Sequence, residues 1–114
     1  MTDMDIKNLS SQVRLSLEAL NAIIISFSKH FAPSDALWLF GSRVNLNKRG
    51  GDIDLYIETD MDNYKAIVEK KIAFVCDIKE TIGDQKIDVV LNVKSLNSDL
   101  EIYKVARLEG VKLV

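Results

Sequence analysis

Two aspartates, Asp52 and Asp54, stand two positions apart in the run GGDIDLYIE, among aliphatic residues. In an extended strand, residues two apart point to the same face, so the two carboxylates share one face and Ile53, Leu55 and Ile57 share the other. Neighbouring carboxylates disfavour each other's ionisation, so the pair should hold a proton or bind a cation. Taken alone, such a pair usually lies on the solvent-exposed face of a strand. The repulsion between the two carboxylates adds a second interpretation, a cation-binding site.

A third aspartate, Asp88, interrupts the apolar run KIDVVLN at 86–92. The run would otherwise predict a buried strand, which makes this carboxylate the least expected of the three. If the two strands are neighbours with their aliphatic faces aligned, Asp88 lies on the same open face as Asp52 and Asp54. An all-oxygen donor set suits Mg²⁺ or Mn²⁺ better than Zn²⁺. Carboxylates shared between two such ions are used for in-line displacement at phosphorus.

Gly41 and Ser42 directly follow the apolar run ALWLF at 36–40, where a turn would present backbone amides. Glycine allows close approach to a phosphate, and the serine hydroxyl adds a hydrogen-bond donor. The loop that follows carries three cations within reach of a polyphosphate, although loop cations are usually solvated: Arg43, Lys48 and Arg49. A Gly-Ser pair is by itself usually only a turn. The ordered set of turn, basic loop and three aspartates predicts a phosphate and metal site.

Hydrophobic periodicity predicts the elements that position these residues. The expected helices cover 5–31, 63–82 and 99–110, and the expected strands cover 36–40, 52–58, 86–92 and an edge strand in the final VKLV. Pro33 should end the first helix, Asp62 should be the N-cap of the second, and Gly83 should stop it. This order predicts a small α/β (α+β) fold in which helices pack on a short mixed sheet, as a single domain over 1–114.

Composition narrows the class of protein. The chain has 47% hydrophobic residues and a net charge of −2, which favours a folded core and argues against direct nucleic-acid binding. A single cysteine, Cys76, and a single histidine, His30, exclude an intrachain disulfide and a Cys/His zinc site. We expect Cys76 to be buried and His30 to interact with its helix C-terminus. The polar N-terminus predicts no signal peptide, and the short aliphatic runs predict no membrane span, so we expect a cytoplasmic protein.

The motifs LFGSR (39–43), GGDIDLYIE (50–58) and KIDVVL (86–91) resemble the DNA polymerase β-like nucleotidyltransferase superfamily. Within it, the chain resembles a minimal nucleotidyltransferase (MNT) of the kind encoded beside HEPN proteins. The likeness covers essentially the whole chain, and the ending VARLEGVKLV is similar too. One departure is that nine residues, 43–51, separate the Gly-Ser pair from the first aspartate, where many minimal members have ten.

The resemblance implies a polymerase β-like fold and a role for each motif residue. It implies that Gly41 and Ser42 hold the triphosphate of a nucleotide and that Arg43 adds a phosphate contact. It implies that Asp52, Asp54 and Asp88 are catalytic residues and ligands of Mg²⁺, two ions being expected, with Mn²⁺ as a substitute. Asp88 is in addition the candidate base for the acceptor hydroxyl.

The resemblance also implies a reaction and a partner. The expected activity is transfer of a nucleoside monophosphate, AMP from ATP, to a tyrosine of a partner HEPN toxin, which makes the chain an antitoxin that assembles into an oligomer. The alternative is a non-catalytic module that neutralises its HEPN partner by binding. Transfer to a small molecule such as an aminoglycoside is a weaker third reading, because such enzymes typically carry an additional acceptor domain. No sequence motif indicates which NTP is used.

Overall fold

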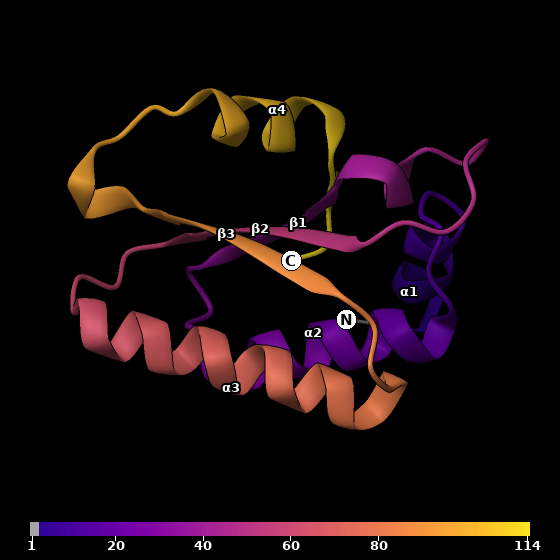
Figure 1. Ribbon diagram of the computed structural model, residues 1–114, viewed down its shortest axis with the longest axis horizontal. Helices are drawn as coiled ribbons and strands as arrows, with labels where there is room; N and C mark the ends of the chain where they lie inside the picture. The colour runs from indigo at the N-terminus through magenta and orange to yellow at the C-terminus, as the bar shows by residue number, and fades with distance from the viewer. Residues whose placement is uncertain (1–2) are drawn as a thin grey trace.

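The computed structural model describes residues 3–114, so the first two residues of the predicted 1–114 domain lie outside the described residues. Within this range, four α-helices and a four-stranded mixed sheet confirm the predicted α/β fold (Figure 1). The elements in chain order are α1 (Asp3–Ser10), α2 (Leu17–His30), β1 (Ala36–Phe40), β2 (Ile53–Thr59), α3 (Tyr64–Ile82), β3 (Ile87–Val93), α4 (Glu101–Glu109) and β4 (Val111–Lys112). No helix of the described chain has the length and apolar content needed to cross a membrane.

The sheet has the strand order β3-β2-β1-β4. Strands β2 and β3 are parallel and are connected by α3, as a parallel pair requires a long crossover. Strand β1 runs antiparallel to both β2 and β4. The predicted C-terminal edge strand is therefore confirmed, and β3 is the opposite edge. The strand that carries Asp88 is thus less buried than its apolar sequence predicted.

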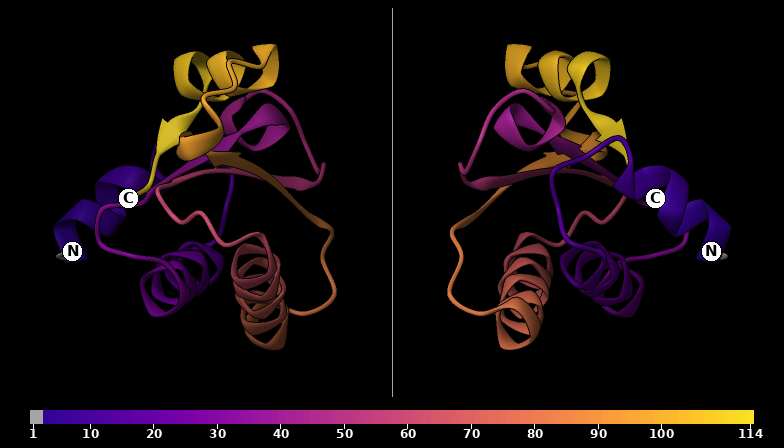
Figure 2. Two further views of the ribbon diagram at one scale, coloured as in Figure 1. Left: turned by 90° about the vertical axis from the view of Figure 1, so that its left-hand side faces the viewer. Right: turned by 90° about the vertical axis from the view of Figure 1, so that its right-hand side faces the viewer.

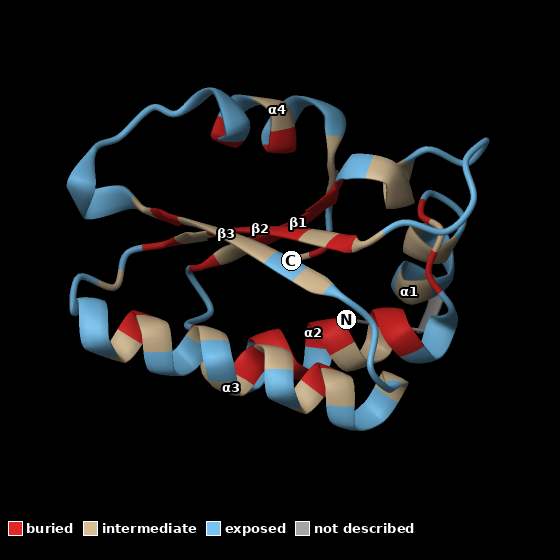
Figure 3. Cartoon of the chain, in the orientation of Figure 1, coloured by how far each residue is buried: buried red, intermediate tan, exposed pale blue. Residues whose placement is uncertain are grey.

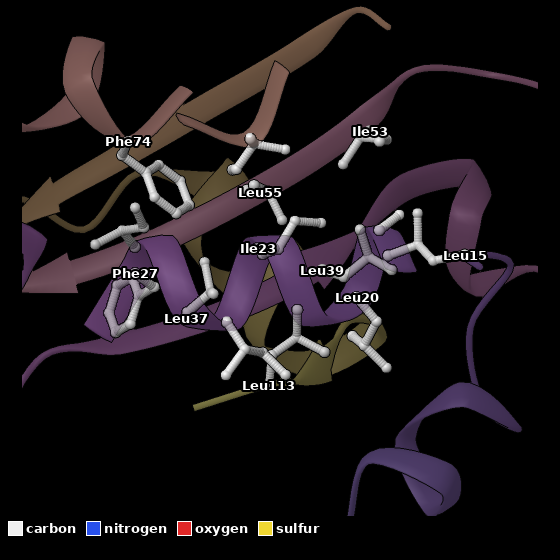
Figure 4. Close-up of a cluster of buried hydrophobic side chains, with 14 of the residues drawn as sticks. Leu15, Leu20, Ile23, Phe27, Leu37, Leu39, Ile53, Leu55, Phe74 and Leu113 are labelled. Carbon is white, nitrogen blue, oxygen red and sulfur yellow. The ribbon is translucent and has the colours of Figure 1, made fainter. Parts of the chain in front are cut away.

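Helices α2 and α3 lie side by side beneath one face of the sheet, and α4 lies over the other (Figures 1 and 2). The core between the sheet and the lower helices is built from the aliphatic faces of the strands and from aliphatic and aromatic side chains of the helices (Figure 4). Its fully buried members include Leu20, Ile23, Leu37, Leu39, Ile53, Leu55, Ile57, Phe74 and Ile78. Burial of such side chains is the main stabilising term of the fold, and it fixes which face of β2 is left for polar residues.

The second face of the sheet is not as open as the sequence indicated. Tyr56 is fully buried there, and Tyr103 and Ala106 of α4 pack on it together with Trp38 and Phe40. Strand β1 is apolar on both faces, so a second layer is needed to cover it. The polar end of the same face, with Asp52 and Asp54 partly buried and Asp88 exposed, remains accessible (Figure 3).

The prediction of one continuous helix over 5–31 is wrong, because residues 11–16 separate α1 from α2. Ser16 caps α2 by accepting a hydrogen bond from the Ala19 amide at 3.0 Å. Within the break, Val13 and Leu15 are buried on either side of Arg14, whose backbone N–H donates to the Arg43 carbonyl at 2.7 Å. Serine side chains favour helix ends over helix interiors, and apolar residues at helical spacing on both sides of the break concealed it.

Two smaller expectations are also corrected. The N-cap of α3 is Asn63 rather than Asp62, while Gly83 ends that helix as predicted, with φ of 88°. Cys76 is exposed rather than buried. His30 lies in the last turn of α2, and its Nε2 bonds Asp77 of α3 at 2.6 Å, a partner that the sequence did not predict.

Candidate functional site

The three predicted aspartates lie at neighbouring positions on β2 and β3. The parallel register pairs Asp54 with Asp88 and aligns the aliphatic faces of the two strands. Asp52 comes one residue before β2, where the Ile53 amide donates to the Lys86 carbonyl at 3.0 Å and joins the starts of both strands. The condition under which the sequence predicted a carboxylate cluster is therefore met.

Electrostatics at this cluster reflect a surplus of negative charge. Partial burial raises the pKa of Asp54 above its ordinary value of 3.8, and the neighbouring Asp88 and Asp52 carboxylates raise it further. Lys86 acts in the opposite direction on the Asp54 pKa. Its Nζ lies 3.5 Å from Asp52 Oδ2 and 4.0 Å from Asp88 Oδ2, so an ammonium group already stands between two of the carboxylates.

The Gly-Ser turn lies directly against the cluster. Residues 41–44 form a short 3₁₀ helix after β1, and Gly41 has a φ of 76°. A Cβ at Gly41 would overlap Asp54 Oδ2, and a Cβ at Gly51 would overlap Ser42 Oγ. Both glycines are thus favoured by their positive φ, and a larger residue would also displace the Asp54 or Ser42 side chain. The structure brings Gly41, Ser42 and Asp54 together, as the sequence predicted.

The three basic side chains of the loop, Arg43, Lys48 and Arg49, do not share one environment. Arg43 donates from Nε to the Gly51 carbonyl at 3.2 Å and from Nη1 to the Arg14 carbonyl at 2.8 Å, so its side chain is engaged with the backbone of the loop. Lys48 and Arg49 are exposed, as expected for loop cations, and among the described residues their side chains form no hydrogen bond or ion pair.

Arg14 is the residue near this site that the sequence did not indicate. Its Nε donates to the Asn45 carbonyl at 2.8 Å, and its Nη2 donates to the carbonyls of Ser42 at 2.8 Å and Gly50 at 2.9 Å. The predicted continuous helix over 5–31 placed this residue inside a helix and gave it no role at the site. An available signal was the cluster of Ser10, Ser11 and Ser16 around it, which is typical of helix ends.

A divalent cation needs several oxygen ligands close to one point. Among the described residues, no three His, Cys, Asp or Glu side chains stand close enough to hold one ion. The Lys86 ammonium group lies within ion-pair distance of Asp52 and Asp88. The backbone register and the oxygen-only donors nevertheless fit a hard cation such as Mg²⁺, which Asp52, Asp54 and Asp88 would hold after side-chain rotation.

Comparison with protein-family models gives no match for this chain, and comparison with curated proteins gives no match either. The assignment of a function therefore depends on the residues of the site, their register and their chemistry.

Proposed function

We propose that this protein is an Mg²⁺-dependent nucleotidyltransferase of the minimal, polymerase β-like kind. The observation that carries the proposal is the pairing of Asp54 with Asp88 across the parallel strands, beside the Gly41-Ser42 turn. A phosphate-holding turn next to a surplus of carboxylates matches the needs of an NTP bound with a divalent cation. The raised pKa of Asp54 supports the same reading, because it marks a place that lacks positive charge.

Each residue of the site has its own role in the proposed reaction. Gly41 and Ser42 hold the triphosphate through the backbone and the serine hydroxyl. Asp52, Asp54 and Asp88 would hold Mg²⁺, which would supply charge neutralisation at the phosphates and at the attacking oxygen. The exposed Asp88 accepts the proton of the acceptor hydroxyl, whose oxygen attacks the α-phosphorus while the bond to pyrophosphate breaks.

The acceptor in this proposal is a tyrosine of a partner HEPN protein, which receives AMP from ATP and is thereby neutralised. The site supports an acceptor that approaches from outside, because Asp88 is about half exposed, with a side-chain exposure of 51%. The neighbouring Asp52 and Asp54 are only partly buried. A protein surface could therefore reach the cluster.

The test is incubation with Mg²⁺, each NTP in turn and the partner HEPN protein, followed by intact-mass measurement of the partner. We expect a nucleotide-sized mass increase with the wild type and none with the Asp52→Asn/Asp54→Asn double variant. Asp84→Asn serves as the matched control, because Asp84 is fully exposed and pairs only distantly with Lys79, at 3.9 Å. No transfer with any NTP, together with full neutralisation by the double variant, would reject the proposal.

A second candidate is a binding module of the same kind that neutralises its partner without catalysis. The observation that favours it is Lys86, whose ammonium group stands where a metal ion would have to approach Asp52 and Asp88. In that case the double variant would neutralise the partner as well as the wild type does. The intact set of three carboxylates and the Gly-Ser turn favours the enzyme.

A further inference from the structure

Arg14 connects two parts of the chain that lie far apart in sequence. It lies in the break between α1 and α2 and is partly buried. Its guanidinium bonds carbonyls at both ends of the loop that separates the Gly-Ser turn from the aspartate strand, namely Ser42 and Asn45 at one end and Gly50 at the other. Hydrogen bonds from a charged donor are about twice as strong as neutral ones, so three of them from one planar group restrain the loop.

The connection is reciprocal. The Arg14 amide donates to the Arg43 carbonyl at 2.7 Å, and Arg43 Nη1 donates back to the Arg14 carbonyl at 2.8 Å. Arg43 Nε also reaches the Gly51 carbonyl, next to Asp52. These contacts and the packing of Ser42 against Gly51 hold the turn and the start of the aspartate strand as one unit.

We infer that Arg14 is a positioning residue for nucleotide binding, acting through the loop and without touching the nucleotide. This inference rests on the proposed function. The guanidinium fixes the carbonyls of the Gly-Ser turn and of the loop, and so fixes where Ser42 and Asp52 stand when the triphosphate arrives. A lysine at this position keeps the charge, but its donors all sit on one nitrogen, so it lacks the planar fork by which Nε and Nη2 of Arg14 bond carbonyls at different points of the loop.

The experiment compares the wild type with Arg14→Lys by calorimetric titration with ATP, GTP, CTP and UTP, each with Mg²⁺. For the NTP that the wild type binds best, we expect Arg14→Lys to raise Kd by roughly tenfold to a hundredfold, as expected for loss of one or two charge-assisted hydrogen bonds. In the transfer assay, KM for that NTP should rise by a similar factor and kcat should change less.

Arg107→Lys is the matched control for a general loss of stability. Arg107 also uses its guanidinium in a network, bonding Tyr56 Oη at 2.9 Å and Glu58 Oε2 at 3.1 Å on the α4 side of the sheet. It should lower the thermal midpoint and leave the Kd for the NTP unchanged. If Arg14→Lys does not fold, Arg14→Gln, which keeps a planar amide donor, takes its place.

The outcomes separate the two proposals. If the wild type binds an NTP and the folded Arg14 variant binds it equally well, or if Arg107→Lys weakens binding as much as the Arg14 variant does, the positioning role is overturned. If the wild type binds no NTP at all, the proposed function itself fails.

Discussion

Asp54 is the most constrained of the candidate site residues. Its carboxylate lies against the backbone of Gly41, beside Asp88 on the next strand and near Asp52 on its own. Burial and the two neighbouring carboxylates raise its pKa, so its ionised form lacks compensation in the protein alone. This uncompensated negative charge around Asp54 is the reason to expect a bound cation.

The contact between Gly41 and Asp54 gives a testable prediction. Gly41→Ala places a Cβ onto Asp54 Oδ2 at a φ of 76°, whereas Gly50→Ala adds a Cβ at a φ of 62° with nothing within 4 Å. We expect Gly41→Ala to lower the free energy of unfolding by about 2–3 kcal/mol and Gly50→Ala by about 1 kcal/mol. Urea denaturation of both variants measures the difference. Equal losses would show that the contact with Asp54 has no energetic role.

Several of these residue-scale features could be predicted from the sequence. The alternation of Asp52 and Asp54 with aliphatic residues fixed their shared face, because side chains alternate strictly along a strand. The positions of Lys86 and the Arg43 guanidinium could not be predicted. The partners of long, flexible side chains depend on the tertiary structure. The Arg43 guanidinium, for example, donates hydrogen bonds to the carbonyls of Gly51 and Arg14.

At the scale of elements, strands and the long helix α3 were predictable and the break in the first helix was not. Each strand has an uninterrupted pattern of period two or an apolar run, and β2 and β3 begin within one residue of the predicted positions. The serines at 10, 11 and 16 are the one local signal of the break at 11–16, but the contacts that stabilise it join Arg14 to residues about thirty positions later. The break between α1 and α2 was therefore missed because it depends mainly on hydrogen bonds to carbonyl groups that are distant in sequence.

The packing of α2 on α3 leads to a prediction on pH. Asp77 of α3 accepts from His30 at 2.6 Å and lies 3.5 Å from Lys29 Nζ, and these two α2 side chains lower its pKa below 3.8. A carboxyl whose pKa is lower in the folded state stabilises the fold above its unfolded pKa, and this stabilisation is lost as the pH falls through the folded value. Asp77→Asn should therefore destabilise the protein at about pH 6 and much less at about pH 2.5.

Urea denaturation at both pH values measures this effect, with Asp84→Asn as the control because its side chain is fully exposed. We expect the control to match the wild type at both pH values. A loss of stability in Asp77→Asn that is the same at low and neutral pH would contradict an ionic role for the contact.

At the scale of the whole molecule, the sheet is covered on both faces but not along its entire length. Helices α2 and α3 cover one face, while α4 covers the central part of the other through Tyr103 and Ala106 (Figure 2). The carboxylates lie next to the Gly-Ser turn, with Asp52 and Asp54 partly buried and Asp88 exposed. The sequence predicted a mixed sheet with helices, but not this second layer, because α4 is short and its contacts with Trp38 and Tyr56 are tertiary.

The most direct test of the central claim is calorimetric titration of ATP into the wild type, Asp88→Asn and Asp84→Asn, with Mg²⁺ and with EDTA in its place. If Asp52, Asp54 and Asp88 hold a cation for a nucleotide bound at Gly41 and Ser42, the wild type and Asp84→Asn bind only with Mg²⁺. Asp88→Asn should then bind at least about tenfold more weakly, since it loses one charged ligand. Equal binding by Asp88→Asn and the wild type, or binding that persists in EDTA, would contradict the account.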